Sequence, residues 1–205
     1  MAQAGVRQTG LTLIELVVGL LIITLLIAIA SPSLDEYRSN RRLATVTNDF
    51  VASVQLARSE AVKRQKIVSM CPTQTVGSRS PTCAEDPNFA AWIVFEDGDG
   101  DCLPVAGAMP IQADAAVPSE EAAHVSARGS GVCISFATSG ALRSVQDMHT
   151  ADRLLVCDGR GVGTPDSTEP SPARGVQIDS NGRVSVTRQR QAIRAWHLSC
   201  PPGNH

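Results

Sequence analysis

Aromatic residues and lysines are scarce in this chain of 205 residues. Phe, Trp and Tyr make up 3% of the sequence, so Val, Ile, Leu and Ala must supply most of the apolar core. Lysine occurs only at Lys63 and Lys66, and every other positive side chain apart from histidine is an arginine. The formal net charge of −2 argues against unspecific nucleic-acid binding by the whole surface, although local basic patches are allowed.

Recognisable catalytic motifs are absent as well. The sequence contains no Gly-x-Ser-x-Gly, no His-Glu-x-x-His and no glycine-rich phosphate loop. No two cysteines have CxxC spacing, and the histidines show no zinc-ligand spacing to a cysteine. We therefore predict a protein that is not an enzyme and needs no cofactor or zinc ion.

A long hydrophobic run near the start of the chain is the dominant feature. Residues 11–30 contain a single charge, Glu15, and roughly 20 apolar residues suffice to cross a bilayer. An ordinary secretory signal has a shorter apolar core and small residues at its far end. Here the small residue Gly10 precedes the run, so cleavage after Gly10 would retain the hydrophobic helix. We predict a leader over residues 1–10 and a transmembrane helix over residues 11–31.

The lone acid Glu15 needs a partner, because a carboxylate in an apolar membrane helix is costly. The α-amino group released by cleavage between Gly10 and Leu11 is a natural partner. Since Glu15 lies on the first helical turn, the amine of a neighbouring subunit suits it better than the amine of its own chain. A plain signal anchor with an incidental Glu15 is the alternative.

The residues from Gly10 to Glu15, read together with the apolar run and Pro32, resemble the class III signal of type IV pilins and pseudopilins. The resemblance implies cleavage after Gly10 by a prepilin peptidase and N-methylation of Leu11. It implies storage in the bacterial inner membrane with a periplasmic globular domain, then assembly through packed helices in which Glu15 is required. Leu11 departs mildly from the Phe or Met usual at this position.

An amphipathic helix is expected over residues 32–66. Pro32 should kink the chain where the membrane helix emerges, because proline within a helix removes a hydrogen bond. Apolar residues then recur at spacings of three and four, the period of a helix that packs one face on a globular body. This predicted apolar stripe consists of Leu34, Tyr37, Leu43, Val46, Phe50, Val54, Ala57 and Ala61.

The remainder, residues 67–205, reads as a β-rich domain, which makes the fold class α+β: one long helix packed on antiparallel sheet. Asn181-Gly182 between two alternating segments predicts a hairpin. Two segments, 104–131 and 159–174, look like loops. The predicted strands cover residues 67–71, 91–95, 132–136, 154–157, 175–179, 183–187 and 195–199.

Further motifs resemble the GspH/FimT branch of minor pilins and pseudopilins. They are the segment 56–64 followed by Cys71, the run 92–95 before an acidic turn, and the run 155–158 before a glycine-rich turn. The late Ser180-Asn181-Gly182-Arg183 with a terminal cysteine agrees with them. This resemblance implies a pilin-like fold and a structural role in a filament made with other pilins.

Six cysteines all follow the hydrophobic run, on the side that would face an oxidising compartment. Their pairing cannot be chosen from sequence alone. A local bridge between Cys71 and Cys83 is plausible, and Cys157 with Cys200 would tie the end of the chain to an inner strand.

Asp97, Asp99 and Asp101 alternate with glycines and form a weak calcium candidate. Cys102 stands where a calcium loop of the EF-hand type needs glycine, and the closing glutamate is missing. A tight turn between strands explains the same pattern, and we prefer that interpretation.

Arginines concentrate near the C-terminus. Arg188 and Arg190 alternate with Gln189 and would share one strand face if the β pattern continues. Such an arginine stripe would suit phosphate groups. Some FimT-type minor pilins are DNA receptors with a Gly-Arg-x-Arg motif here. The chain matches its first arginine at Arg183 but has Ser185 in place of the second. Solvated charges on a strand edge are the alternative interpretation. The candidate DNA-binding residues are Arg174, Arg183, Arg188, Arg190 and Arg194.

Together these observations predict a minor pilin of a type IV pilus, with a GspH-type pseudopilin of type II secretion as the alternative. A DNA receptor of the transformation pilus is a further alternative of a different class.

Overall fold

The computed structural model describes residues 12–75, 78, 81–105, 107, 109–115, 124–128, 132–145, 149–164, 169–198 and 200, without the side chains of 28–33, 114, 115 and 149. The chain divides into two compact units, residues 1–39 and residues 40–205.

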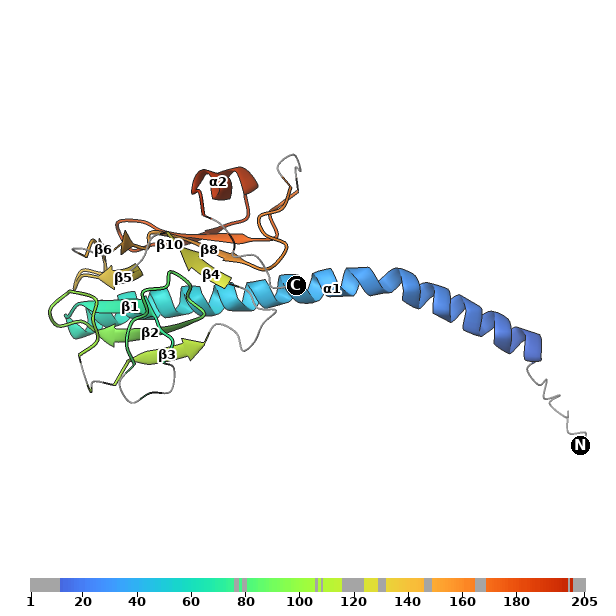
Figure 1. Cartoon of the computed structure of the whole chain (residues 1–205), viewed down its shortest axis with the longest axis horizontal. Coiled ribbons are helices and arrows are strands. Elements are labelled where there is room, and N and C mark those ends of the chain that lie inside the picture. The colour runs from blue at the N-terminus through green and yellow to red at the C-terminus, as the bar shows by residue number, and fades with distance from the viewer. Residues whose placement is uncertain are drawn as a thin grey trace, which may run out of the picture. The chain divides into compact units, whose positions relative to one another are not determined.

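One helix, α1 (Leu13–Arg64), runs through both units (Figure 1). Thr12 precedes it, and the Thr12 hydroxyl accepts the Glu15 N–H at 3.4 Å, as an N-capping residue does. Helix α1 continues through Pro32 without a break in its assignment, and the kink expected there stays a prediction. It ends where Gln65 takes a left-handed backbone conformation with φ 55°.

The apolar stripe of α1 is buried only in the second unit. Leu34 and Tyr37 are 52% and 57% exposed, so the predicted stripe was wrong for these two residues, which precede residue 40. The buried members of the stripe are Leu43, Val46, Phe50, Val54, Ala57 and Ala61.

Sheet A packs its inner face on this stripe. Its strands β3-β2-β1-β5-β6 lie in that order, and β7 pairs parallel to β5. Trp92 and Val94 of β2 belong to the core shared with α1, whereas Ile93 and Phe95 face the opposite side. The strands are β1 (Val68–Pro72), β2 (Ala91–Glu96), β3 (Gln112–Ala115), β5 (Val132–Phe136), β6 (Leu142–Arg143) and β7 (His149–Thr150).

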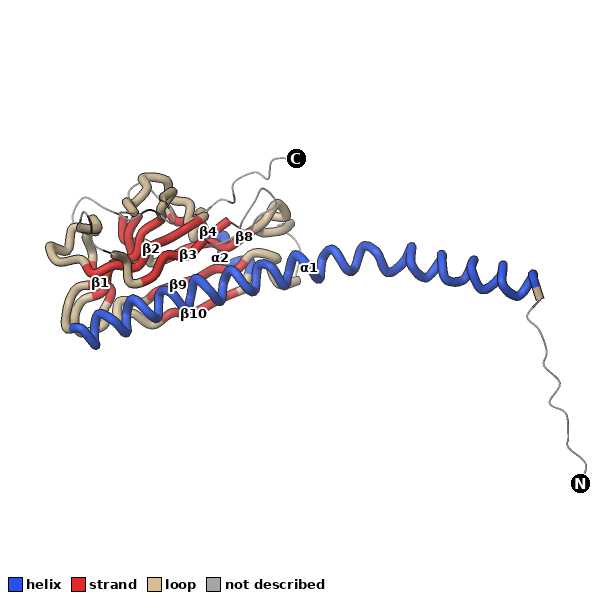
Figure 2. The backbone as a smooth tube through the Cα atoms, turned by 90° about the horizontal axis from the view of Figure 1, so that it is seen from below, coloured by secondary structure: helices blue, strands red, loops and turns tan. Residues whose placement is uncertain are grey.

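Sheet B contributes to the same core, in the antiparallel order β10-β9-β8-β4 (Figure 2). Leu154 and Val156 of β8 join the core around α1, whereas Leu155 faces the other side. There Ile193 of the short helix α2 (Arg190–Ala195) covers Leu155. The strands are β4 (His124–Ala127), β8 (Arg153–Cys157), β9 (Arg174–Ile178) and β10 (Val184–Thr187).

The structure confirms the α+β fold and corrects two parts of the predicted layout. Of the predicted strand over residues 195–199, the described residues 195–198 form no strand, because α2 ends at Ala195 and a turn follows, and residue 199 lies outside the described residues. Segment 104–131, predicted to be a loop, contains β3 and β4. Partners distant in sequence define these strands: β3 pairs with β2, and β4 pairs with β8.

The β9–β10 hairpin is held against the helix by a close backbone contact. Gly182 in its turn has φ 75°, and a Cβ placed there would lie 2.2 Å from the Gly140 carbonyl oxygen. The same oxygen accepts a hydrogen bond from Arg58 Nε of α1 at 3.0 Å. The β9–β10 hairpin turn, the turn at Gly140 and helix α1 therefore meet at Gly182, where only glycine fits.

We expect Gly182→Ala to destabilise the protein by at least about 1–2 kcal/mol, because alanine is strained in this conformation and also clashes with Gly140. Urea unfolding of the full chain in detergent, followed by tryptophan fluorescence, measures the change. Gly159→Ala is the matched control, since a Cβ at Gly159 meets nothing within 4 Å. Equal midpoints for the two variants would contradict the role given to Gly182.

Candidate assembly and binding surfaces

The first candidate surface is the start of α1. Gly10 and Leu11, the predicted cleavage and methylation residues, lie outside the described residues. Glu15 is exposed on the first turn, and within the described part of the chain its carboxylate forms no ion pair or hydrogen bond. Pro32, the other predicted assembly residue, lies within α1, and its side chain is outside the described set.

Large apolar side chains are exposed on every face of this segment. Their exposed fractions range from 41% at Val17 to 82% at Leu13. A helix that is hydrophobic all round is normally buried in other protein or in lipid. The exposed side chains are Leu13, Ile14, Leu16, Val17, Val18, Leu20, Leu21, Ile22, Ile23, Leu25, Leu26 and Ile27.

A search of the described residues finds no helix with both the length and the apolar character of a membrane span.

The C-terminal arginines form the second candidate surface, and most of them bind backbone oxygens of the loop between β8 and β9. Arg188 Nε donates to the Ser171 carbonyl at 3.1 Å, and Arg194 Nη2 donates to the Gly163 carbonyl at 3.0 Å. Arg190 is 8% exposed and donates to the Thr164 carbonyl. Arg183 differs, because its side chain is exposed beside the hairpin turn.

The prediction that Arg188 and Arg190 share one strand face was wrong. Strand β10 ends at Thr187, and Arg190 is the first residue of α2. Both guanidinium groups nevertheless donate hydrogen bonds to the 159–174 loop. This loop was expected to be exposed, but its Ser171 and Ala173 are buried.

Arg174, the remaining candidate, lies beside α1. Its Nη2 donates to the Asn40 carbonyl oxygen at 3.0 Å, and Arg160 Nη1 donates to the Asn40 side-chain oxygen at 3.1 Å. Burial lowers the pKa of the Arg174 guanidinium, and the charges of Arg188 and Arg160 lower it further. Arg160 was not among the residues predicted from the sequence, because it follows Asp158-Gly159 in an ordinary turn pattern.

The acidic triplet organises a turn. Asp97 is 1% exposed, and its carboxylate accepts hydrogen bonds from the Ser69 hydroxyl at 2.6 Å, the Gly100 N–H at 2.9 Å and the Cys102 N–H at 3.0 Å. Asp101 accepts the Leu103 N–H at 2.9 Å, and Asp99 is exposed. Within the described residues no three acidic, histidine or cysteine side chains are grouped to hold a metal ion. These contacts favour the turn over the calcium interpretation.

Asp97→Ala should lower the free energy of unfolding by about 1–3 kcal/mol, because it leaves a buried hydroxyl and two N–H groups without their acceptor. Asp99→Ala, an exposed carboxylate in the same turn, should change it little. Urea unfolding of both variants, with and without added calcium, measures the effect. Calcium stabilisation that vanishes in Asp99→Ala would restore the metal interpretation.

All six cysteines are paired in disulfides. The pairs Cys71–Cys83 and Cys157–Cys200 are those considered from the sequence. A third, Cys102–Cys133, joins the Asp97 turn to β5 and was not foreseen. Because cross-links restrict the unfolded chain, these bridges stabilise loops that have few apolar residues of their own.

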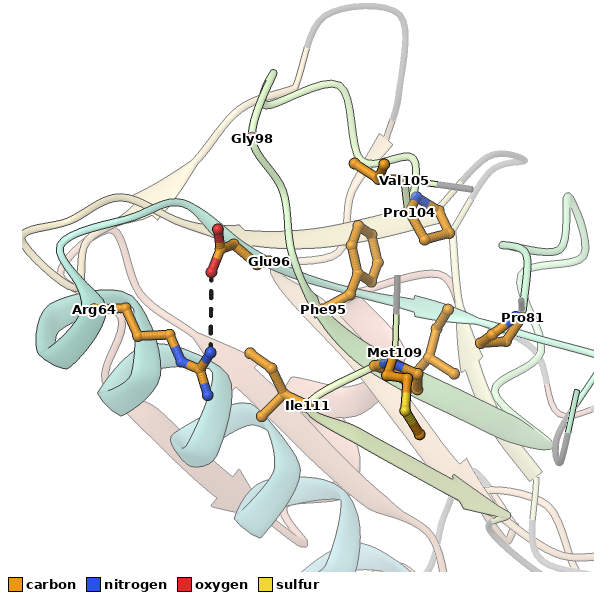
Figure 3. A pocket seen from close by; sticks show the side chains of 11 residues that line it. Arg64, Pro81, Phe95, Glu96, Gly98, Pro104, Val105, Met109 and Ile111 are labelled. Carbon is orange, nitrogen blue, oxygen red and sulfur yellow. Dashed lines mark ion pairs between the residues drawn. The ribbon is translucent and has the colours of Figure 1, made fainter. Parts of the chain in front are cut away.

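A cavity of about 360 Å³ lies on the outer side of sheet A (Figure 3). Ile93 and Phe95 of β2 contribute apolar lining, and Arg64 pairs with Glu96 at 3.9 Å along its border. Met109, also in the lining, is 87% exposed. No sequence signal predicted this cavity, because its lining comes from segments far apart in the sequence: the end of α1, strand β2 and the loops around residues 81 and 104–111.

Comparison with known families assigns the chain to a family. The family model described as type II transport protein GspH matches residues 46–182, more than half of the chain. The chain belongs to the GspH family. It is therefore a member of the minor pilins and GspH-type pseudopilins, whose subunits are structural.

Two solved structures are similar to this GspH-family chain, both of the type IV minor pilin FimU from Pseudomonas aeruginosa. Each is 14% identical in sequence. One covers 81% of this chain and 98% of its own with a TM-score of 0.47. The other, from a second crystal form, covers 78% and 98% with a TM-score of 0.44. Comparison with curated proteins finds no match.

Proposed function

We propose that this chain is a minor pilin that is built into a type IV pilus, or caps it. One observation carries the proposal: the segment from Leu13 to Ile27 exposes apolar side chains on all faces and has one charge, Glu15. Such a surface requires burial among other helices or in lipid. A pilus core of packed subunit helices supplies that burial, and other pilins are the partners it requires.

The proposed life cycle has two stages. The inner membrane first holds the apolar segment, residues 11–31, with the globular domain in the periplasm. Prepilin peptidase then cleaves after Gly10, Leu11 is N-methylated, and the helix moves into the filament. The domain limits of this proposal are residues 1–10, 11–31, 32–66 and 67–205.

Glu15 gives the assembly step its specificity. In an apolar filament core an unpaired carboxylate is strongly unfavourable, and the amine of an adjacent subunit cancels its charge. The Glu15 carboxylate has no partner within the described part of its own chain, which supports a partner on another copy.

Glu15→Ala should reduce incorporation into sheared filaments by about tenfold or more, because it removes a buried ion pair worth several kcal/mol when one partner is lost. Immunoblots of filament and membrane fractions measure incorporation, and mass spectrometry of the N-terminus reports cleavage. Glu36→Ala, an exposed acid on the same helix, is the control. Normal incorporation of Glu15→Ala, or filaments built from uncleaved chains, would contradict the proposal.

A pseudopilin of type II secretion is the second candidate, since the family includes both kinds of subunit. A deletion strain separates them: loss of exoprotein secretion with normal pili would indicate the pseudopilus. Neighbouring genes would provide the same distinction.

A DNA-binding role is favoured by one observation, the exposed Arg183 directly after Gly182 at the hairpin turn. Arg188 and Arg194 are already engaged with loop carbonyls, so Arg183 is the residue best placed to contact phosphate.

If the protein is a DNA receptor, the detergent-solubilised full chain should retard duplex DNA at low salt and lose affinity steeply as salt rises. Arg183→Ala should weaken binding and reduce the salt slope by roughly one unit, for one lost phosphate contact. Arg128→Ala removes the same charge elsewhere. Equal effects of the two variants would eliminate a specific role for Arg183.

A further inference from the structure

Two arginines from different parts of the second unit contact residue 40 of α1, and a third lies near one of them. Arg174 at the start of β9 and Arg160 in the loop after β8 both donate to Asn40, at 3.0 Å and 3.1 Å. Arg188, just after β10, is close enough for its charge to disfavour the protonated form of Arg174. The fold therefore gathers like charges at one place, which needs a compensating interaction.

Carboxylates compensate only one of these charges. Asp158 pairs with Arg160 at 2.7 Å. Within the described residues neither Arg174 nor Arg188 forms an ion pair, and both donate only to backbone oxygens. Burial and the two neighbouring charges lower the pKa of Arg174, so a negative charge beside it would favour its cationic form.

One donor of the cluster also lacks an acceptor. The Arg174 Nε is buried and makes no hydrogen bond. Buried donors in proteins nearly always have a partner, and an orphaned one requires an explanation. An oxyanion beside Arg174 and Arg188 would relieve the repulsion, since guanidinium groups bind phosphate through paired hydrogen bonds. A shift of the Arg174 side chain toward the anion would also give its Nε an acceptor.

The place of the cluster along the chain indicates the kind of anion. Asn40 follows the proposed membrane segment 11–31 by nine residues, between two and three helical turns. Anionic headgroups attract arginines that are this close in sequence to a membrane segment, and the length of the arginine side chain allows it to extend toward them.

We propose that Arg160, Arg174 and Arg188 form an anion site that binds the phosphate of an anionic lipid headgroup while the subunit is stored in the membrane. The inference rests on the proposed membrane stage. It assigns the cluster a role distinct from DNA binding at Arg183, and release of the headgroup accompanies transfer into the filament.

The test uses the full chain in a neutral detergent and three probes: dihexanoyl phosphatidylglycerol, dihexanoyl phosphatidylcholine and inorganic phosphate. Affinity is followed by NMR shifts of the arginine Nε–H groups. We expect phosphatidylglycerol to shift these resonances saturably. Inorganic phosphate should shift the same resonances with weaker affinity, and phosphatidylcholine should not shift them. Binding of inorganic phosphate equal to that of phosphatidylglycerol would show a free-phosphate site and overturn the lipid assignment.

Arg174→Gln combined with Arg188→Gln should weaken phosphatidylglycerol binding by roughly tenfold or more. Arg128→Gln combined with Arg153→Gln, the same charge change elsewhere, should leave it unchanged. Arg188→Gln alone covers the case in which loss of Arg174 impairs folding, because Arg188 is exposed. Equal affinities for Arg188→Gln and the wild type would overturn the proposal.

A short DNA duplex that shifts these same resonances and binds more tightly than phosphatidylglycerol would also overturn the lipid proposal. That result would indicate a nucleic-acid site. Failure of the lipid site leaves filament incorporation of the wild-type chain unaffected. Failure of the minor-pilin proposal is instead detected by the Glu15→Ala incorporation assay, so the two outcomes can be told apart.

Discussion

The burial of one face of α1 by two sheets is the interaction on which the second unit depends. Phe50 at the middle of that face contacts Phe89 and Trp92 edge to face, with ring centroids 5.4 Å and 5.3 Å apart. With so few aromatic residues, the chain concentrates three of them around one point of the helix. The outer faces of the sheets then need separate covers: disulfide-tied loops over sheet A and helix α2 over sheet B.

The first unit obeys the opposite constraint, because its helix offers no hydrophilic face between Leu13 and Ile27. A helix that packs one face on a globular body needs a polar face for the solvent, but here the apolar side chains are exposed on all sides. Within the described part of the single chain, these side chains are not buried and the Glu15 carboxylate has no partner. The physical requirement for burial thus becomes a requirement for other molecules, first lipid and then neighbouring subunits, under the proposed function.

Local patterns in the sequence predicted those elements whose signal is itself local. The alternating strands around Asn181-Gly182 and the buried helix face from Leu43 to Ala61 are of this kind. Strand β3 could not be predicted, because Gln112-Ala113-Asp114-Ala115 becomes a strand only through pairing with β2. The run around Trp196 misled for a related reason: its apolar residues cover the outside of sheet B and do not extend it. Likewise Asn40 and Arg160, which lie far apart in sequence, carry no motif that announces their contact.

The arginines show why composition alone gave an incomplete account of the C-terminal region. A cluster of positive residues suggested one stripe for phosphate, yet the fold gives its members different tasks. Arg190 and Arg194 donate to carbonyls of the loop between β8 and β9. Arg183 is exposed at the hairpin turn. Arg174 lies between like charges with a buried Nε that lacks an acceptor. The planar guanidinium group can donate to several carbonyls at once, which the lysine ammonium group does less well. The preference for arginine over lysine in this chain therefore agrees with its hydrogen bonds to loop carbonyls as well as with its charge.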